Sequence, residues 1–428
     1  MNKNPSNCMA AFHGIRKSTA LKVTLAALLA LSRTAPAQPV IMPVPSYPVT
    51  PPAVQEDQAN NEMMVFIPAG GGPGGAQEAQ PFQYGIFTLR PHPYYRFLYG
   101  SGILVNTNQA ENTFLNQISP GILLDIGRHW TLDYTPTLNF YSSGQFKDTL
   151  DHSVALTGGT SYGDWIFGLS QHFTSTSDPL VQTATQTSQE TFTTALNASY
   201  QFNDKMSADL GLGQNVISAD QFNSSSEWST LDWLNYQFWP RLDAGLGLGF
   251  GYVNMQTSPD MTYEQLQGRV NWRATDKISF QVHVGGEDRQ FLSGGSGDLL
   301  NFVFEAVVQY QPFDVTKISI NANRSVAPSY FTGVTENTDF TGELNQRLLG
   351  KLSLDVQGGY HVVKYVGSAS TSSVGREDDL YSVSVQLSYP FARRGSVSAF
   401  YQASSNSSTQ PGFSYSSSQV GFQISYTY

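Results

Sequence analysis

The chain has 428 residues, of which 40% are hydrophobic, 13% aromatic and 13% charged, and its formal net charge is −10. The charged share is about half that of an ordinary soluble protein, and the net acidity argues against a nucleic-acid partner. The longest apolar run, "LAALLAL" at 25–31, is far shorter than the roughly 20 residues that a membrane-spanning helix needs. The abundance of Tyr, Phe, Gly and Ser instead suits a protein with one face in lipid and one in water.

Residues 1–37 have the pattern of a secretory signal peptide. Basic residues precede an apolar centre at 23–31, and "APA" at 35–37 forms a small-residue cleavage site. Cleavage there would remove the only cysteine, Cys8, with five basic residues and no acidic ones, leaving 18 basic against 33 acidic residues. We therefore expect an exported, strongly acidic protein whose fold does not depend on disulfides.

Residues 38–83 form a leader rich in Pro and Gly, including "QPVIMPVPSYPVTPP" and "AGGGPGG". Proline favours an extended backbone and glycine loosens it, so we expect little regular structure there. From residue 84 to 428 the residue composition and patterning are uniform, and we expect this whole region to be one barrel domain.

Alternation of apolar and polar residues runs through this region. In the last stretch, "SQVGFQISYTY", every second residue is apolar or aromatic and the others are small or polar. The same pattern occurs at 206–213, 278–285, 352–357 and 381–389. Alternate residues of a strand point to opposite faces, whereas helical spacing fits none of these segments.

Two kinds of turn signal alternate along the chain. Eight short ones lie near residues 127–129, 163–164, 203–205, 240, 275–276, 312–314, 350–351 and 392–394. Longer polar segments lie between them, the longest expected at 175–189. The layout predicts an all-β fold: an antiparallel up-and-down transmembrane barrel of about 18 strands, with 16 as the alternative count, short periplasmic turns and long extracellular loops.

The composition of the two faces of the predicted strands favours a transmembrane barrel over a soluble β-sandwich. Hydrocarbon offers no partner for a bare N–H or C=O, so only helices and closed barrels satisfy every backbone group there. Aromatic residues also gather near the predicted strand ends, as expected for the two interfacial girdles. Tyr365 is one of the residues that we assign to the girdle beside the long loops.

The stretch "RLDAGLGLGFGY" at 241–252 places four glycines at every second position. A phosphate-binding loop needs a different spacing and a following helix. We interpret the stretch as a strand whose inner face carries almost no side chains, which leaves room for a bulky neighbour or an inward-folded loop. Two further residues, Pro120 and Pro136, lie eight residues on either side of the turn at Arg128. A regular hairpin would set them opposite each other, with a gap in the ladder.

Several charged residues have the alternation expected of the barrel interior. The lumen-lining candidates are Asp133, Asp209, Asp232, Asp243, Arg269, Arg273, Glu305, Glu343, Arg347 and Asp355. Because the acids outnumber the bases, an open pore would prefer cations weakly. Equally, these residues could pair with one another and only structure the lumen.

The segment "NQISPGILLDIGRHWTLDYTPTLNFYS" at 116–142 resembles the putative β-barrel porin-2 families of Gram-negative outer-membrane proteins, and so does the final hairpin, "FYQASSNSSTQPGFSYSSSQVGFQISYTY". The resemblance covers about residues 84–428, by patterning more than by invariant residues. It implies an outer-membrane barrel, and some members accompany exopolysaccharide secretion loci. The terminal Tyr428 resembles the aromatic end that barrel-insertion machinery recognises.

Catalytic and metal-binding signals are weak. No H-E-x-x-H or G-x-S-x-G motif is present. The alternation places His283 and His361 on the inward face of their strands. A catalytic triad depends on contact geometry, which the sequence does not give. The acidic segments "GGEDRQ" at 285–290 and "GREDD" at 375–379 are expected to be solvated loops, with Ca²⁺ or lipopolysaccharide bridging as the alternative.

The sequence thus predicts a porin-like passive diffusion channel in the bacterial outer membrane, weakly selective for cations, with no enzymatic activity and no cofactor. The alternatives are a barrel that serves polysaccharide export and a structural or adhesive barrel with a blocked lumen. Expected partners are outer-membrane lipid, lipopolysaccharide, the insertion machinery and, in the second hypothesis, polysaccharide-export proteins. Nucleic acid is not an expected partner.

Overall fold

The computed structural model describes residues 82–106, 109–292, 298–331, 333–367, 375–391 and 394–427. The predicted signal peptide at 1–37, all but the last two residues of the predicted leader, and Tyr428 lie outside the described residues.

Strands account for almost all of the described chain. In chain order they are β1 (Phe82–Tyr84), β2 (Phe87–Asn106), β3 (Gln109–Ile126), β4 (Trp130–Tyr141), β5 (Thr149–Tyr162), β6 (Trp165–Leu180), β7 (Thr185–Asn203), β8 (Met206–Ala219), β9 (Ser225–Trp239), β10 (Leu242–Met255), β11 (Met261–Thr275), β12 (Ile278–Phe291), β13 (Leu299–Phe313), β14 (Thr316–Pro328), β15 (Val334–Leu348), β16 (Leu352–Val366), β17 (Glu377–Phe391), β18 (Gly395–Ser408) and β19 (Tyr415–Tyr426). Within the described residues, no helix is long and apolar enough to cross a membrane.

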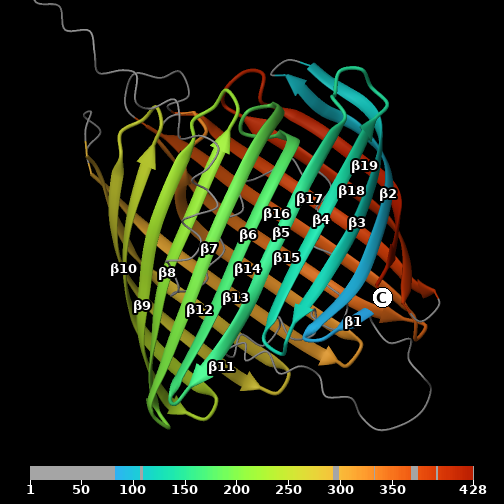
Figure 1. Cartoon of the computed structure of the whole chain (residues 1–428). Coiled ribbons are helices and arrows are strands. Elements are labelled where there is room, and N and C mark those ends of the chain that lie inside the picture. Colours follow the sequence, from blue (N-terminus) through green and yellow to red (C-terminus); the bar gives the residue numbers. More distant parts are fainter. Residues whose placement is uncertain are drawn as a thin grey trace, which may run out of the picture.

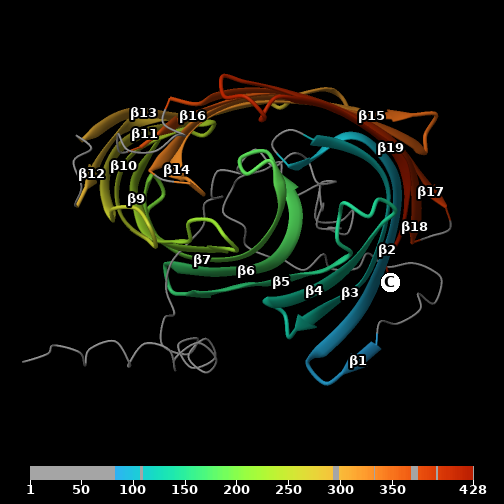
Figure 2. The ribbon, with the colours of Figure 1, turned by 90° about the horizontal axis from the view of Figure 1, so that it is seen from above.

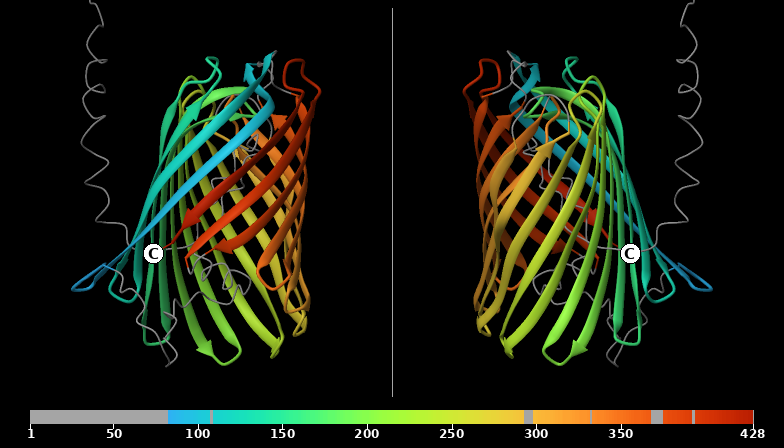
Figure 3. Two further views of the ribbon diagram at one scale, coloured as in Figure 1. Left: turned by 90° about the vertical axis from the view of Figure 1, so that its right-hand side faces the viewer. Right: turned by 90° about the vertical axis from the view of Figure 1, so that its left-hand side faces the viewer.

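Strands β2 to β19 close into one antiparallel barrel of 18 strands (Figure 1). Each strand pairs with its neighbours in sequence, and β19 returns to β2 with Val420 opposite Tyr99. Two further side views show the wall continuing around the molecule (Figure 3). The predicted fold and the count of 18 are confirmed, and 16 is wrong. The three residues of β1 form a small hairpin with Phe87–Leu89 of β2, at the end of the barrel that carries the short turns.

The turns between strands follow the predicted alternation, with two differences. The turn signals predict the first wall strand at about 93–105, but it begins at Phe87, because "FTLRPHPYY" joins the ladder although it holds two prolines. The long loop predicted at 175–189 is wrong. There β6 continues to Leu180 and β7 starts at Thr185, paired residue by residue through Ser177 and Ser188. The segment is polar but rich in threonine, a β-branched residue that suits strands.

The outer wall is apolar, as the alternation predicts. Leu246 is 70% exposed, Phe302 56% and Phe250 54%, an arrangement that suits lipid contact. Aromatic residues beside the short turns are exposed on this face, including Trp239 and Trp272. The assignment of Tyr365 to the outer girdle is wrong, because its side chain is buried and donates a hydrogen bond to Asp378 at 3.2 Å.

The glycine strip of β10 holds the bulky neighbours that its sequence predicts. A Cβ atom added to Gly247 would lie 2.7 Å from the indole ring of Trp233, its partner on β9. Gly251 lies in the same way against the ring of Tyr263 on β11. Because these inner positions have no side chains, the two rings lie flat on the inner wall and are buried.

The ladder between β3 and β4 is interrupted where the two prolines were expected to meet. Pairing runs through Ile118 and resumes at Ile122, because proline has no N–H to donate. Across the gap, the hydroxyl groups of Ser119 and Thr137 lie 2.8 Å apart. The predicted gap is therefore confirmed, and a side-chain hydrogen bond spans it.

A methyl group at Gly247 tests the packing of the inner strip. Gly247→Ala is expected to lower the free energy of unfolding by about 1–3 kcal/mol, since the Trp233 ring must move. Gly342→Ala is the matched control, because a Cβ atom there meets nothing within 4 Å. Urea unfolding followed by tryptophan fluorescence measures both variants. Equal stability of the two would contradict the packing described here.

Candidate pore constriction

The β6–β7 hairpin leaves the wall at the end of the barrel opposite the short turns and folds into the lumen. Seen along the axis, the ends of both strands curl toward the centre (Figure 2). Both strands of the hairpin contact β2 on another part of the wall, and residues 181–184 form the tip between them. Val181 and Ala184 are almost fully buried there, against Leu104 of β2, Leu380 of β17 and two aromatic residues, Phe413 and Tyr415. The tip thus crosses the lumen and narrows it.

A buried arginine, Arg376, directly precedes β17 and holds the tip. The Arg376 guanidinium donates to the carbonyl oxygens of Gln182 at 2.9 Å and Val181 at 3.2 Å. It also forms an ion pair with Asp378, and both side chains are 2% exposed or less. The Arg376 Cζ atom lies 3.5 Å from the centre of the Phe413 ring and 4.5 Å from that of Tyr365. One cation therefore joins the tip to the far wall through hydrogen bonds, charge and ring contacts.

The loop between β14 and β15 meets the same hairpin from another side. Gln182 donates from Nε2 to the Ser329 hydroxyl at 2.8 Å, and the Tyr330 hydroxyl donates to Gln189 of β7. Burial raises the pKa of Tyr330, so the hydroxyl keeps its proton. The next residue, Phe331, packs edge-on against Phe222 and Phe413, with ring centres 5.7 and 6.5 Å apart. Loops from three parts of the wall therefore converge on the hairpin.

A second buried ion pair lies on β12. The Arg289 Nε atom donates to Glu287 at 2.8 Å, both side chains are 2% exposed or less, and Cζ of Arg289 lies 4.6 Å from the centre of the Tyr263 ring. Gln265 donates to the other oxygen of Glu287 at 2.6 Å. The prediction of solvated acidic loops at 285–290 and 375–379 is therefore wrong for these pairs, because in each segment an arginine two residues away neutralises the carboxylate.

Most of the lumen-lining candidates lie on the face opposite the exposed apolar residues, in paired groups. Arg269 contacts Asp209, and Asn235 bridges the two at 2.8 and 2.9 Å. Asp133 lies 2.8 Å from His92, and Glu305 lies 3.4 Å from His283. Asp243 accepts a hydrogen bond from Asn271 at 2.7 Å. This part of the wall thus has the internal pairing that the sequence left open as an alternative to ion selectivity.

The remaining candidates lie nearer the short turns. Asp355 accepts a hydrogen bond from its neighbour Asn345. Glu343 and Arg347 are exposed on β15, on the same face as Asn345, and Arg273 is exposed on β11. These four charged residues are spread over β11, β15 and β16 and do not form one cluster.

The placement of Asp232 inside the lumen is wrong. Asp232 lies opposite Leu248 in the β9–β10 ladder, and directly paired residues share a face. Leu248 and Leu234 on that face are 55% and 53% exposed. Asp232 is therefore on the lipid side, where its Oδ1 atom accepts the backbone N–H of Gly211 at 2.9 Å.

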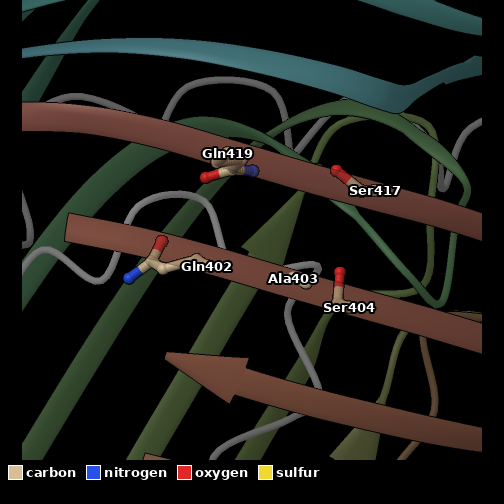
Figure 4. A pocket seen from close by; sticks show the side chains of 5 residues that line it. All are labelled: Gln402, Ala403, Ser404, Ser417 and Gln419. Atoms are coloured by element: carbon tan, nitrogen blue, oxygen red, sulfur yellow. The ribbon is translucent and has the colours of Figure 1, made fainter. Parts of the chain in front are cut away.

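The inner face of β18 and β19 forms a polar hollow (Figure 4). Its lining consists of Gln402, Ala403, Ser404, Ser417 and Gln419. Arg96, buried beside it, reaches Gln402 at 3.5 Å and lies over the Phe400 ring at 4.0 Å. Amide and hydroxyl groups of this kind can exchange hydrogen bonds with water or a polar solute. In the described residues no group of three or more His, Cys, Asp or Glu could hold a metal ion.

Solved outer-membrane barrels resemble the structure in architecture. OccAB4 of Acinetobacter baumannii has 11% identity and a TM-score of 0.43, with 79% of this chain and 98% of that chain covered. OccK2 (OpdF) of Pseudomonas aeruginosa in complex with glucuronate has 10% identity and a TM-score of 0.45, with 79% of this chain and 98% of that chain covered. OpdK of P. aeruginosa with vanillate has 9% identity and a TM-score of 0.44, with 79% of this chain and 99% of that chain covered. At such identities the likeness concerns the barrel fold alone.

The closed 18-stranded wall with its apolar outer face defines an outer-membrane β-barrel of the porin type, located in the bacterial outer membrane. Residues 259–428 match the model of the family described as Putative beta-barrel porin 2. The resemblance recognised in the sequence is thereby confirmed over that segment. No curated protein matches the chain by sequence.

Removal of the Arg376 charge tests its role at the tip. Arg376→Met leaves the buried Asp378 carboxylate without its cation, and we expect a loss of about 3–5 kcal/mol in unfolding free energy. The double variant Arg376→Met/Asp378→Leu has no buried charge left and is expected to recover most of that loss. Urea titration of the refolded barrels measures both. A single variant as stable as the double one would show that the pair does not hold the tip.

Proposed function

We propose that this barrel is a passive diffusion channel whose narrowest passage lies beside the β6–β7 hairpin. The observation that carries the proposal is the hairpin tip at 181–184, anchored on the far wall by Arg376. An 18-stranded barrel is wide enough to hold an aqueous channel, so its permeability is set by what folds inside. Polar side chains such as Gln402, Ser404 and Ser417 line the wall on β18 and β19 (Figure 4), and Tyr415 of the apolar cluster around the tip begins β19.

Weak cation preference is the second part of the proposal. Glu343 is exposed near the short turns, and Asp355 is bonded to the neutral Asn345 rather than to a base. By contrast, Arg269, Arg289 and Arg376 each lie against a carboxylate. Asp243 is likewise bonded to a neutral amide, that of Asn271. These three acids outnumber the two exposed bases, Arg273 and Arg347, and carboxylates on the path of an ion favour cations.

Shortening the hairpin tests the constriction. Replacing 180–185 by Asn-Gly gives a two-residue turn between Pro179 and Gln186, which already face each other. The variant is expected to show a larger single-channel conductance in planar bilayers, because the tip no longer crosses the passage. The Gly342→Ala barrel serves as the control. An unchanged conductance would place the narrowest point elsewhere.

Neutralising Glu343 and Asp355 tests selectivity. Under a KCl gradient, the native channel is expected to give a reversal potential on the cation side. The variant Glu343→Gln/Asp355→Asn should move that potential toward zero, and more so at low salt, where charges are screened less. Selectivity unchanged in the double variant, or an anion-selective native channel, would overturn the assignment.

Two alternatives remain hypotheses with their own readouts. A structural or adhesive barrel with a blocked lumen is favoured by the hairpin tip, which touches the far wall through Val181 and Ala184. Correctly folded protein that passes no current would support it. A role in polysaccharide export would require binding to export proteins, which co-purification from the outer membrane would detect.

A further inference from the structure

One sector of the lipid-facing wall is polar at mid-height. Gln171 on β6 lies opposite Thr194 on β7, which lies opposite Gln214 on β8. Asp232 on β9 lies on the same outer face. Apolar residues flank the row above and below, with Leu169 and Phe173 on β6, Phe192 and Leu196 on β7, and Leu212 and Val216 on β8. We call Gln171, Thr194, Gln214 and Asp232 the polar belt.

The rest of the outer wall differs at the corresponding positions. Outward residues midway along most other strands are apolar; examples are Leu248, Val282, Ala306, Ile320, Val356, Val385 and Val420. An outward polar residue on β3, Asn116, accepts a hydrogen bond from the Tyr95 hydroxyl at 2.9 Å. The belt differs from both, because it sets polar side chains on four adjacent strands.

The belt is poorly satisfied within the chain. Among the described residues, no hydrogen bond joins the side chains of Gln171, Thr194 or Gln214 to another group. Asp232 uses Oδ1 to accept the Gly211 N–H, where the β8–β9 ladder has a gap between Leu212 and Asp209. Acyl chains offer no donors or acceptors, so polar groups left against them are costly and require a protein partner.

We propose that the polar belt is the interface with a second copy of this chain. A two-fold axis along the membrane normal, between β7 and β8, would set β6 of one copy against β9 of the other. Gln171 would then face the partner's Asp232, an amide donor against a carboxylate. The belt is self-complementary in this sense: its one carboxylate meets an amide that has no hydrogen-bond partner within the described chain.

The heights of Gln171 and Asp232 agree with this pairing. In Figure 1 strands β6 and β7 tilt from lower left to upper right, and β9 lies to the left of β6. A line perpendicular to the strands therefore rises from Gln171 to Trp228, its position on β9. Asp232 lies four residues further down β9, about 13 Å along a strand, which returns it to the level of Gln171.

Paired cysteines test the interface. Within one barrel, Gln171 and Asp232 lie three strands apart and are displaced by four residues along the strands, roughly 19 Å in all, which is too far for a disulfide. The variant Gln171→Cys/Asp232→Cys, with Cys8→Ser, is therefore expected to form disulfides only between copies, seen as a covalent oligomer on non-reducing gels of outer membranes. The control, Ile318→Cys/Val385→Cys, places two outward residues three strands apart on the opposite wall and should remain single.

A second measurement keeps the proposal open to refutation if the cysteine variant folds poorly. Native protein in mild detergent is expected to have the mass of more than one chain, and Gln171→Leu/Gln214→Leu the mass of one, with folding checked by heat-modifiable gel mobility. A native barrel that is monomeric, a leucine variant that keeps the native mass, or cross-links only to a different protein or lipopolysaccharide would each overturn the proposal.

Discussion

The structure depends on the pairing of every backbone N–H and C=O of the wall, because the hydrocarbon core supplies no substitute. That condition is met only when β19 returns to β2, which it does from Ser418 to Ser425. Closure fixes which residues face lipid and which face the lumen on all 18 strands. The wall tolerates two prolines, Pro120 and Pro136, where the β3–β4 ladder is interrupted. A hydrogen bond between the hydroxyl groups of Ser119 and Thr137 spans that gap.

Closure at this size creates a second requirement, which concerns the inside. Wall side chains alone do not fill a lumen of 18 strands, and here a hairpin of the wall itself turns inward. A buried tip must have its carbonyl groups satisfied, and Arg376 does so for Val181 and Gln182. Its own charge is balanced by Asp378 and by two aromatic rings. The buried charges are thus a consequence of folding polar backbone into the barrel.

The sequence predicts the wall better than the interior. Strand number and turn positions follow from local signals, namely two-residue alternation and Gly, Asp or Pro at turns. The glycine strip of β10 is likewise a local pattern, and it correctly predicts room for Trp233 and Tyr263. The constriction has no such signal, because Arg376 and Val181 lie 195 positions apart. Their contact depends on the curvature of a hairpin whose polar sequence is typical of an exposed loop.

Asp232 shows why the chemical nature of one residue is a weaker guide than the register of its strand. On β9 the even positions include Trp228, Leu234, Tyr236 and Phe238, so the alternation assigns this face to lipid. The odd positions also hold a tryptophan, Trp233, so both faces of the strand contain large aromatic residues. The sequence prediction therefore relied on the charge of Asp232 and placed it in the lumen. The ladder with β10 removes the ambiguity, since Gly247 accommodates Trp233 on the inside and Leu248 lies beside Asp232 on the outside. A charged residue on a barrel strand therefore indicates either the lumen or a place where the wall meets something other than lipid, and only the partners of its neighbours distinguish the two.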